Sequence, residues 1–146
     1  MVLKVFKAVW FLSVIVVLAS LLWVYASLPE RVIVQETMQG RIEVDRNIFF
    51  YIVMIVLALF NALVYAAARL FRYQEEFRTW FYGLIISLNI FFVVGMSLIS
   101  LYNSAEHFDY PRIGFIIYGS VLLVIGWAMS WPVYKIFKGT TAKQVV

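Results

Sequence analysis

The sequence predicts an all-α integral membrane protein with four transmembrane helices, both termini in the cytoplasm, and a short extracytoplasmic β-hairpin between the first two helices. Three observations predict this fold class. Of the 146 residues, 64% are hydrophobic and 14% are charged, whereas an ordinary soluble domain has about 45–50% apolar and about 25% charged residues. The apolar residues gather in four long stretches without Asp, Glu, Lys, Arg or His. Most Lys and Arg residues lie on one side of these stretches.

The four apolar stretches have the length of transmembrane helices and span about residues 8–28, 48–68, 80–102 and 113–134. At roughly 1.5 Å per residue, each crosses the ~30 Å hydrocarbon layer of a bilayer. The bilayer core offers no water to the backbone amides, so each segment has to satisfy its own hydrogen bonds as a helix. We expect the chain to form one four-helix transmembrane domain, residues 1–146.

The first stretch also has features of a signal peptide. Lys4 and Lys7 precede it, and the small-residue pattern Val24-Tyr25-Ala26 lies near its end. Its apolar run is longer than the roughly 7–15 residues of a signal-peptide core. We therefore expect a membrane anchor that is retained.

Residues at the borders of the later stretches predict where those helices begin and end. Asn47 and Thr79 are suited to cap the second and third helices, and Pro111 stands just before the fourth, where a missing amide costs little. Pro132 predicts a kink or an early stop near the end of the fourth helix. The segment Arg69–Thr79 predicts a helical extension, with opposite charges one turn apart.

The first loop predicts a β-hairpin. The segments Arg31–Gln35 and Arg41–Asp45 alternate or are β-branched, and the five residues Glu36–Gly40 between them end in a glycine, which adopts a positive φ readily. A two-stranded hairpin is marginal in water, so its apolar face needs a cover. Phe108 and Tyr110 offer a small cover within the chain, but we expect the face to dock on a partner subunit. That face comprises Val32, Val34, Ile42 and Val44.

The basic residues predict the orientation of the chain. Eight of the twelve Lys and Arg residues lie in the N-terminal segment, the loop after the second stretch and the C-terminal tail, whereas six of the eight acidic residues lie in the other two loops. The positive-inside rule then places both termini in the cytoplasm. We expect a multi-pass protein of the bacterial cytoplasmic membrane.

Two amides are the deepest polar side chains, Asn61 in the second stretch and Asn89 in the third. They either contact a substrate or a lipid headgroup, or form a hydrogen bond between helices that stabilises the bundle. Proton and ion paths through a membrane usually contain an ionisable residue, and the four stretches contain no Asp, Glu, Lys, Arg or His. This composition speaks against a proton-coupled transporter that acts alone.

Small residues recur four positions apart, a spacing that lets helix backbones approach closely. We expect these positions to pack helices, either inside the bundle or against another subunit. They are Ala58, Ala62, Ala66, Gly83, Ser87, Gly126 and Ser130.

The sequence contains no recognisable catalytic or phosphate-binding motif. It has no cysteine, which excludes disulfides and thiolate metal sites. Its one histidine lies in Glu106-His107-Phe108-Asp109, which is either a metal site or pH sensor or a solvated loop. We expect no enzymatic activity, no cofactor and no nucleic-acid partner, and the sequence identifies no small-molecule substrate.

The first loop resembles one known family. Leu28-Pro29-Glu30-Arg31-Val32, followed by Gly40 and Asp45, is similar to the pattern after the first helix of SdpI-type bacterial membrane proteins. Members of that family include an immunity protein and signal transducer for a secreted toxin. The resemblance covers about twenty residues, and Gln35 stands where the family tends to have His. It implies a similar arrangement of loop and helix.

Three functions are compatible with these features. The first is a non-catalytic membrane subunit that packs against other integral membrane subunits of a respiratory, energy-transducing or secretion complex, in contact with membrane lipids. The second is an SdpI-like immunity or sensor protein that acts through its outer hairpin. The third is a small transporter or lipid-handling protein that uses Asn61 and Asn89. We favour the first, because the loops are short and the apolar stretches lack charged side chains.

Overall fold

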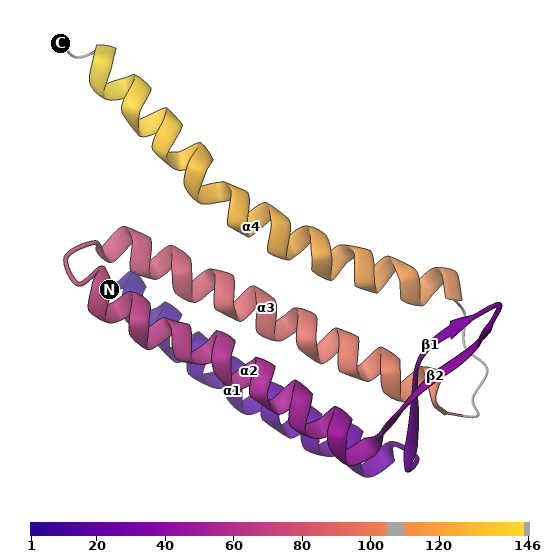
Figure 1. Ribbon diagram of the computed structural model, residues 1–146. Helices are drawn as coiled ribbons and strands as arrows, with labels where there is room; N and C mark the ends of the chain where they lie inside the picture. Colours follow the sequence, from indigo (N-terminus) through magenta and orange to yellow (C-terminus); the bar gives the residue numbers. More distant parts are fainter. Residues whose placement is uncertain (105–109, 145–146) are drawn as a thin grey trace.

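The computed structural model describes residues 1–104 and 110–144 of the chain. Four helices and one two-stranded antiparallel sheet make up this part (Figure 1). The elements are α1 (Val2–Ser27), β1 (Arg31–Thr37), β2 (Gly40–Asp45), α2 (Arg46–Leu70), α3 (Glu75–Tyr102) and α4 (Tyr110–Gln144). Each helix is long and apolar enough to cross a membrane. The prediction of four apolar helices, with a small hairpin between the first two, is confirmed.

Helix α3 lies at the centre of the arrangement. It packs against α1, α2 and α4, whereas α4 has no backbone contact with α1 or α2 within the described residues. Figure 1 shows α1, α2 and α3 as a bundle, with α4 beside α3 and its last turns leaving the bundle. The fourth helix therefore depends on α3 for its place.

The buried side chains form two clusters along the bundle. We call the end with β1 and β2 the hairpin end, and the end with the α2–α3 connection the turn end. The cluster toward the hairpin end comprises Val17, Leu21, Val24, Leu28, Val32, Phe49, Leu57 and Met96. The cluster toward the turn end comprises Leu3, Val64, Tyr82 and Ile85.

The predicted helical extension over Arg69–Thr79 is confirmed at its two ends, but a turn interrupts it between α2 and α3. Helix α2 ends at Leu70, and α3 begins at Glu75. The aromatic rings of Phe71 and Phe77 lie 4.3 Å apart and pack the two helix ends together. This contact forms because the chain reverses direction at the turn. In a continuous helix the rings of Phe71 and Phe77 would lie too far apart to touch in this way.

The helix caps also differ from those predicted. Asp45 caps α2, because its carboxylate accepts a hydrogen bond of 2.8 Å from the backbone N–H of Asn47. The Asn47 side chain instead accepts a hydrogen bond of 2.7 Å from the Tyr25 hydroxyl. Thr79 lies inside α3 and donates to the carbonyl of Glu75 at 2.9 Å. Both caps were predicted too far along the chain.

The two prolines of α4 lie at different places in the helix. Pro111 lies in the first turn, where its missing N–H leaves no helical carbonyl without a partner. Pro132 lies inside the helix, which continues to Gln144. Of the two outcomes predicted at Pro132, a kink or an early stop, the early stop is therefore wrong.

Two indole rings join α3 to α4. The Nε1–H of Trp80 donates to the carbonyl of Trp127 at 2.9 Å, and the Nε1–H of Trp127 donates to the carbonyl of Trp80 at 2.8 Å. Each indole thereby satisfies its only polar group in apolar surroundings. The Trp127 ring lies directly over Gly83, where a Cβ atom would overlap it. The absence of a side chain at Gly83 lets the reciprocal pair form.

We expect the substitution Gly83→Ala to destabilise the packing of α4 on α3 by about 1–3 kcal/mol, because the added methyl group overlaps the Trp127 ring. The matched control is Gly95→Ala on the same helix, where a Cβ atom meets nothing within 4 Å. Thermal unfolding in detergent and near-ultraviolet circular dichroism of the tryptophans measure the effect. Equal stability of the two variants would contradict the close approach.

Candidate functional site

The two deep amides lie against each other. Asn61 of α2 donates from Nδ2 to Oδ1 of Asn89 at 2.9 Å, and Asn89 of α3 donates from Nδ2 to Oδ1 of Asn61 at 3.0 Å. Trp10 of α1 adds a hydrogen bond of 3.0 Å from its indole to Oδ1 of Asn61. The amide pair therefore links α1, α2 and α3.

The remaining hydrogens of the two amides also have partners inside the bundle. Asn61 donates to the carbonyl of Leu57 at 2.9 Å, and Asn89 donates to the Ser13 hydroxyl at 2.9 Å. That hydroxyl donates in turn to the carbonyl of Trp10 at 2.7 Å. Each amide thus uses both of its N–H groups within the protein. The arrangement stabilises the helix packing and leaves neither amide a hydrogen for a substrate.

The small residues of α2 lie on the side of the helix away from the bundle. Ala58, Ala62 and Ala66 are all exposed. The residues that α2 buries are Phe49, Leu57, Val64 and Ala67. With 3.6 residues per turn, the three alanines fall on the face opposite to those buried residues. No helix of the described part of the chain covers this outward face.

The other small pairs have different surroundings. Gly83 lies under the Trp127 ring, and Ser87 is buried and donates to the carbonyl of Gly83 at 2.9 Å. On α4, Gly126 faces open space, and Ser130 is exposed and donates to the carbonyl of Trp127 at 2.6 Å. The pair on α3 thus packs inside the protein, whereas on α4 Gly126 faces open space and Ser130 lines a cleft between α1, α3 and α4.

The hairpin has a tighter turn than predicted. Thr37 pairs with Gly40, so Met38 and Gln39 alone form the connection, in place of the predicted five residues Glu36–Gly40. Gly40 adopts a φ of +146°, which side chains disfavour. The longer strand pairing, and this glycine, account for the short turn.

A bulge at Val34 divides the four apolar residues of the hairpin. Val32 pairs with Val44, and the register shifts between Ile33 and Gln35. Val32 is completely buried in the core toward the hairpin end, and Val44 packs against that core. Val34 and Ile42 are 46% and 51% exposed. The chain's own helices therefore cover Val32 and Val44. Val34 lines a cavity of about 410 Å³ between the hairpin, α3 and α4, and Ile42 faces outward.

Asn103 attaches the hairpin to the end of α3. The Asn103 side chain accepts a hydrogen bond of 2.7 Å from the Ile33 N–H and donates one of 3.1 Å to the Ile33 carbonyl. It also donates to the carbonyl of Ile99 at 2.8 Å. On the other side, the backbone N–H of Arg46 donates to the carbonyl of Glu30 at 2.9 Å. The hairpin is thus fixed to both α2 and α3.

Glu36 makes a further link between the hairpin and α3. The Tyr102 hydroxyl donates to the Glu36 carboxylate at 2.6 Å, and Arg41 forms an ion pair with the same carboxylate at 2.8 Å. These two contacts, the Tyr102 hydrogen bond first, lower the pKa of Glu36 below its ordinary value of 4.5. The link is therefore present at neutral pH and is lost only when acid protonates the carboxylate, below that value.

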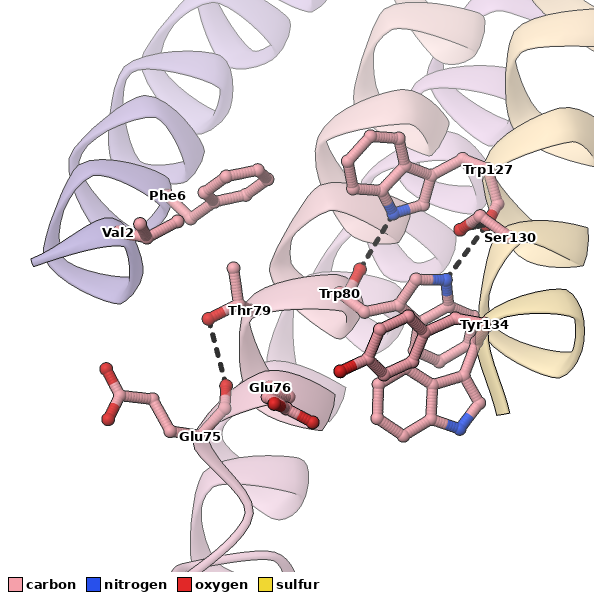
Figure 2. Close-up of a pocket in the computed structure, with 10 residues that line it drawn as sticks. Val2, Phe6, Glu75, Glu76, Thr79, Trp80, Trp127, Ser130 and Tyr134 are labelled. Carbon is pink, nitrogen blue, oxygen red and sulfur yellow. Dashed lines mark hydrogen bonds between the residues drawn. The ribbon is translucent and has the colours of Figure 1, made fainter. Parts of the chain in front are cut away.

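A cleft lies at the turn end of the described structure, between α1, α3 and α4. Its volume is about 600 Å³, within the usual range of ligand sites. Its lining residues are Val2, Phe6, Glu75, Glu76, Thr79, Trp80, Trp127, Ser130, Trp131 and Tyr134. Figure 2 shows Val2 and Phe6 on one side, Trp80, Trp127 and Tyr134 on the other, and the two glutamates near the end of the cleft.

The charges at this cleft are mixed. Lys138 forms an ion pair of 3.2 Å with Glu76, and its ammonium group lies 5.5 Å from the centre of the Tyr134 ring. Lys135 lies over the Trp131 ring at 5.7 Å. Within the described residues, Glu75 forms no ion pair. The cleft therefore combines aromatic walls with one paired and one unpaired carboxylate.

The sequence patterns did not predict this cleft. Trp80, Trp131 and Tyr134 stand near the ends of the apolar stretches, a position that aromatic residues often take at a membrane surface. Only the fold brings them together with Phe6 of the first helix. The dense run of aromatic residues near Trp80 is the one signal in the sequence that pointed to this place.

Some predicted features lie outside the described residues. These are the segment Glu106-His107-Phe108-Asp109 and the side chain of Tyr110. Among the residues that the structure describes, no cluster of three His, Asp or Glu side chains is arranged to bind a metal ion.

We expect the substitution Asn89→Leu to destabilise the bundle by about 1–3 kcal/mol, because it leaves an N–H of Asn61 without a partner in apolar surroundings. Combining it with Asn61→Leu should restore part of that loss, since both polar partners are then removed. The control is Ser97→Ala, which removes a hydroxyl that bonds within its own helix. Reversible unfolding in mixed micelles gives the free energies. An Asn89→Leu variant as stable as the control would mean that the amide network does not stabilise the bundle.

No protein-family model, no curated protein and no solved structure matches this chain. The similarity of the first loop to SdpI-type proteins therefore remains a resemblance. The functional proposals below rest on the geometry of the chain itself.

Proposed function

We propose that this protein is a non-catalytic subunit of a membrane protein complex, and that it packs on a transmembrane helix of another protein. The observation that supports this most directly is the outward face of α2, where Ala58, Ala62 and Ala66 are exposed. The amide network adds to it, because Asn61 and Asn89 use their N–H groups inside the bundle.

A face of small residues favours a protein helix as its neighbour. Lipid tails are as apolar as leucine, so helices in a membrane associate through close packing and interhelical hydrogen bonds. Alanines on successive turns let a second backbone approach closely, which increases the van der Waals contact. The α2 face has this pattern along three positions, and the bundle itself does not use it.

The hairpin offers the partner a second contact. Ile42 is 51% exposed on it, Val34 borders a cavity between the hairpin, α3 and α4, and Asn103 fixes the strand that carries Val34. Because the hairpin is already attached to α3, a partner would meet a preformed surface, and binding would cost little ordering of the chain. Val32 and Val44 act here as the attachment of the hairpin to the core.

The partner would lie in the same membrane, and we propose the bacterial cytoplasmic membrane with both termini in the cytoplasm. Single cysteines at Gln39, in the hairpin turn, and at Thr140, near the end of α4, test this orientation in a chain that has no cysteine of its own. A membrane-impermeant thiol reagent on intact cells should label position 39 alone. Labelling of position 140 alone would reverse the orientation.

We expect the substitution Ala62→Phe to reduce the amount of co-purifying partner protein at least tenfold, because the ring separates α2 from the partner helix. The stability of the isolated protein should not change, since Ala62 is exposed in the bundle. The matched control is Ala19→Phe, at an exposed position of α1. Mild-detergent purification with quantitative mass spectrometry measures both variants.

Three outcomes of this experiment are distinguishable. Loss of a distinct membrane protein with Ala62→Phe, but not with Ala19→Phe, supports the subunit proposal. A complex that contains only copies of this chain would replace it with self-association. Unchanged co-purification with Ala62→Phe would mean that lipid, and not protein, covers the alanine face.

A further inference from the structure

The contacts of β1 show which way the backbone groups of β2 point. The N–H and the carbonyl of Ile33 both bond to the Asn103 side chain, so they are directed away from β2. Paired residues of an antiparallel sheet either exchange both backbone hydrogen bonds or exchange none. Glu43, the partner of Ile33, therefore directs its N–H and carbonyl away from β1. The bond from the Arg46 N–H to the Glu30 carbonyl, three positions farther along, fits the same alternation.

The outer edge of β2 has free backbone groups at Arg41 and Glu43. Arg41 lies two residues from Glu43, and the extra residue of the bulge belongs to β1, so the backbone groups of both residues point the same way. Within the described residues, β2 contacts only β1 and the helix α2 that follows it. A free sheet edge of this kind is a template for a further strand.

The charges of β2 are complementary to a second copy of the same strand. In an antiparallel pair centred on Ile42, the Ile42 side chains of the two copies lie side by side, and Arg41 of each copy lies opposite Glu43 of the other. Since both residues direct their backbone groups outward, each such pair exchanges two backbone hydrogen bonds. Opposite charges at directly opposed positions stabilise a sheet.

Neighbouring registers of the two strands lack this complementarity. A shift by two residues places either Arg41 opposite Arg41 or Glu43 opposite Glu43, and like charges at opposed positions are destabilising. A shift by one residue pairs the outward-directed groups with residues whose groups point inward. The register centred on Ile42 is therefore the one that satisfies both the backbone and the charges.

Both charged side chains are accessible to a second copy. Arg41 and Glu43 are exposed, and Glu43 forms no ion pair within the described residues. Arg41 already binds Glu36 of its own hairpin at 2.8 Å. A guanidinium group has five N–H donors, so Arg41 can bind a second carboxylate without giving up the first.

The direction of the hairpin fits a pair of copies in one membrane. Two copies with the same orientation are related by a two-fold axis along the membrane normal, and such an axis pairs two strands antiparallel only where they run across it. Figure 1 shows the hairpin crossing the end of the bundle, at a steep angle to the helices. β1 accordingly contacts α2 and α3 and lines a cavity together with α4.

We propose that two copies of this protein associate through β2, whose outer edges pair antiparallel about Ile42. The two-stranded sheets of the two copies then form one four-stranded sheet, a size at which a sheet is more stable than an isolated hairpin. This pairing uses the backbone edge of β2 and leaves the outward face of α2 free. The inference therefore does not rest on the proposed function.

The test is disulfide crosslinking of the full chain in membranes, which is specific because the chain has no cysteine of its own. In the proposed pair, the Cα atoms of the two Ile42 residues lie about 4.5 Å apart, within the range of a disulfide. With copper phenanthroline as oxidant, we expect Ile42→Cys to form a dimer about fivefold or more faster than Met38→Cys. Met38 is the matched control, because it is more exposed than Ile42 on the same hairpin and lies far from its counterpart in this register.

Charge variants test the register. All of them carry Ile42→Cys together with Glu36→Gln, which removes the carboxylate that Arg41 binds in its own hairpin. Adding Glu43→Arg places arginines opposite each other and should slow crosslinking about fivefold. Adding Arg41→Glu to that variant restores opposite charges and should restore the rate. Glu30→Arg is the control, since it makes the same change of charge outside β2.

Two results would overturn the proposal. Equal crosslinking of Ile42→Cys and Met38→Cys would show that the β2 edges do not meet, as in a dimer through another surface. A rate that stays low after the charges are exchanged would exclude this register. Ala62→Phe, which tests the proposed function, should leave the crosslinking of Ile42→Cys unchanged, so failure of one idea is distinguishable from failure of the other.

Discussion

The amide pair of Asn61 and Asn89 is the interaction on which the three-helix bundle depends. Apolar packing in a lipid environment does little to choose one rotation of a helix over another, because lipid tails compete equally for apolar surface. A polar group that cannot bond to water needs a hydrogen-bond partner within the protein. Here Asn61 of α2 and Asn89 of α3 bond to each other, and Trp10 and Ser13 of α1 bond to them as well. The network therefore fixes the rotation and height of α1, α2 and α3 together, and the two apolar clusters then pack on either side of it.

The fourth helix is held by other contacts than this amide network. It is attached through the reciprocal hydrogen bonds of Trp80 and Trp127, and this attachment requires the bare backbone of Gly83. Helix α4 has no backbone contact with α1 in the described structure, but the two helices meet through the rings of Phe6 and Trp127, whose centres lie 5.9 Å apart. Aromatic contacts of Trp131 with Phe77 and Trp80 add to this attachment, so α3 holds α4 along the turn end. The outward face of α2 takes no part in these contacts, so it stays available to a partner helix.

Composition and periodicity were enough to predict the helices, because a charge-free run of bilayer length has few alternatives in lipid. They were also enough to find Asn61 and Asn89, since an amide among apolar residues stands out. They could not show which side of α2 the alanines occupy, because Ala58 and Ala67 look alike in the sequence and only packing separates exposed from buried. The cleft was missed for the same reason: Phe6 and Tyr134 lie far apart along the chain, and the fold alone brings them together.

The Asn103 side chain occupies part of one unpaired edge of the two-stranded sheet. A two-stranded sheet presents two rows of free backbone groups, and each is a template for pairing with a foreign strand. The Asn103 amide bonds to both the N–H and the carbonyl of Ile33, as a neighbouring strand would. It thereby closes the β1 edge at its centre, next to the bulge that already interrupts the strand. Strand addition to this sheet, whether by a partner or by aggregation, is thus directed to the β2 edge.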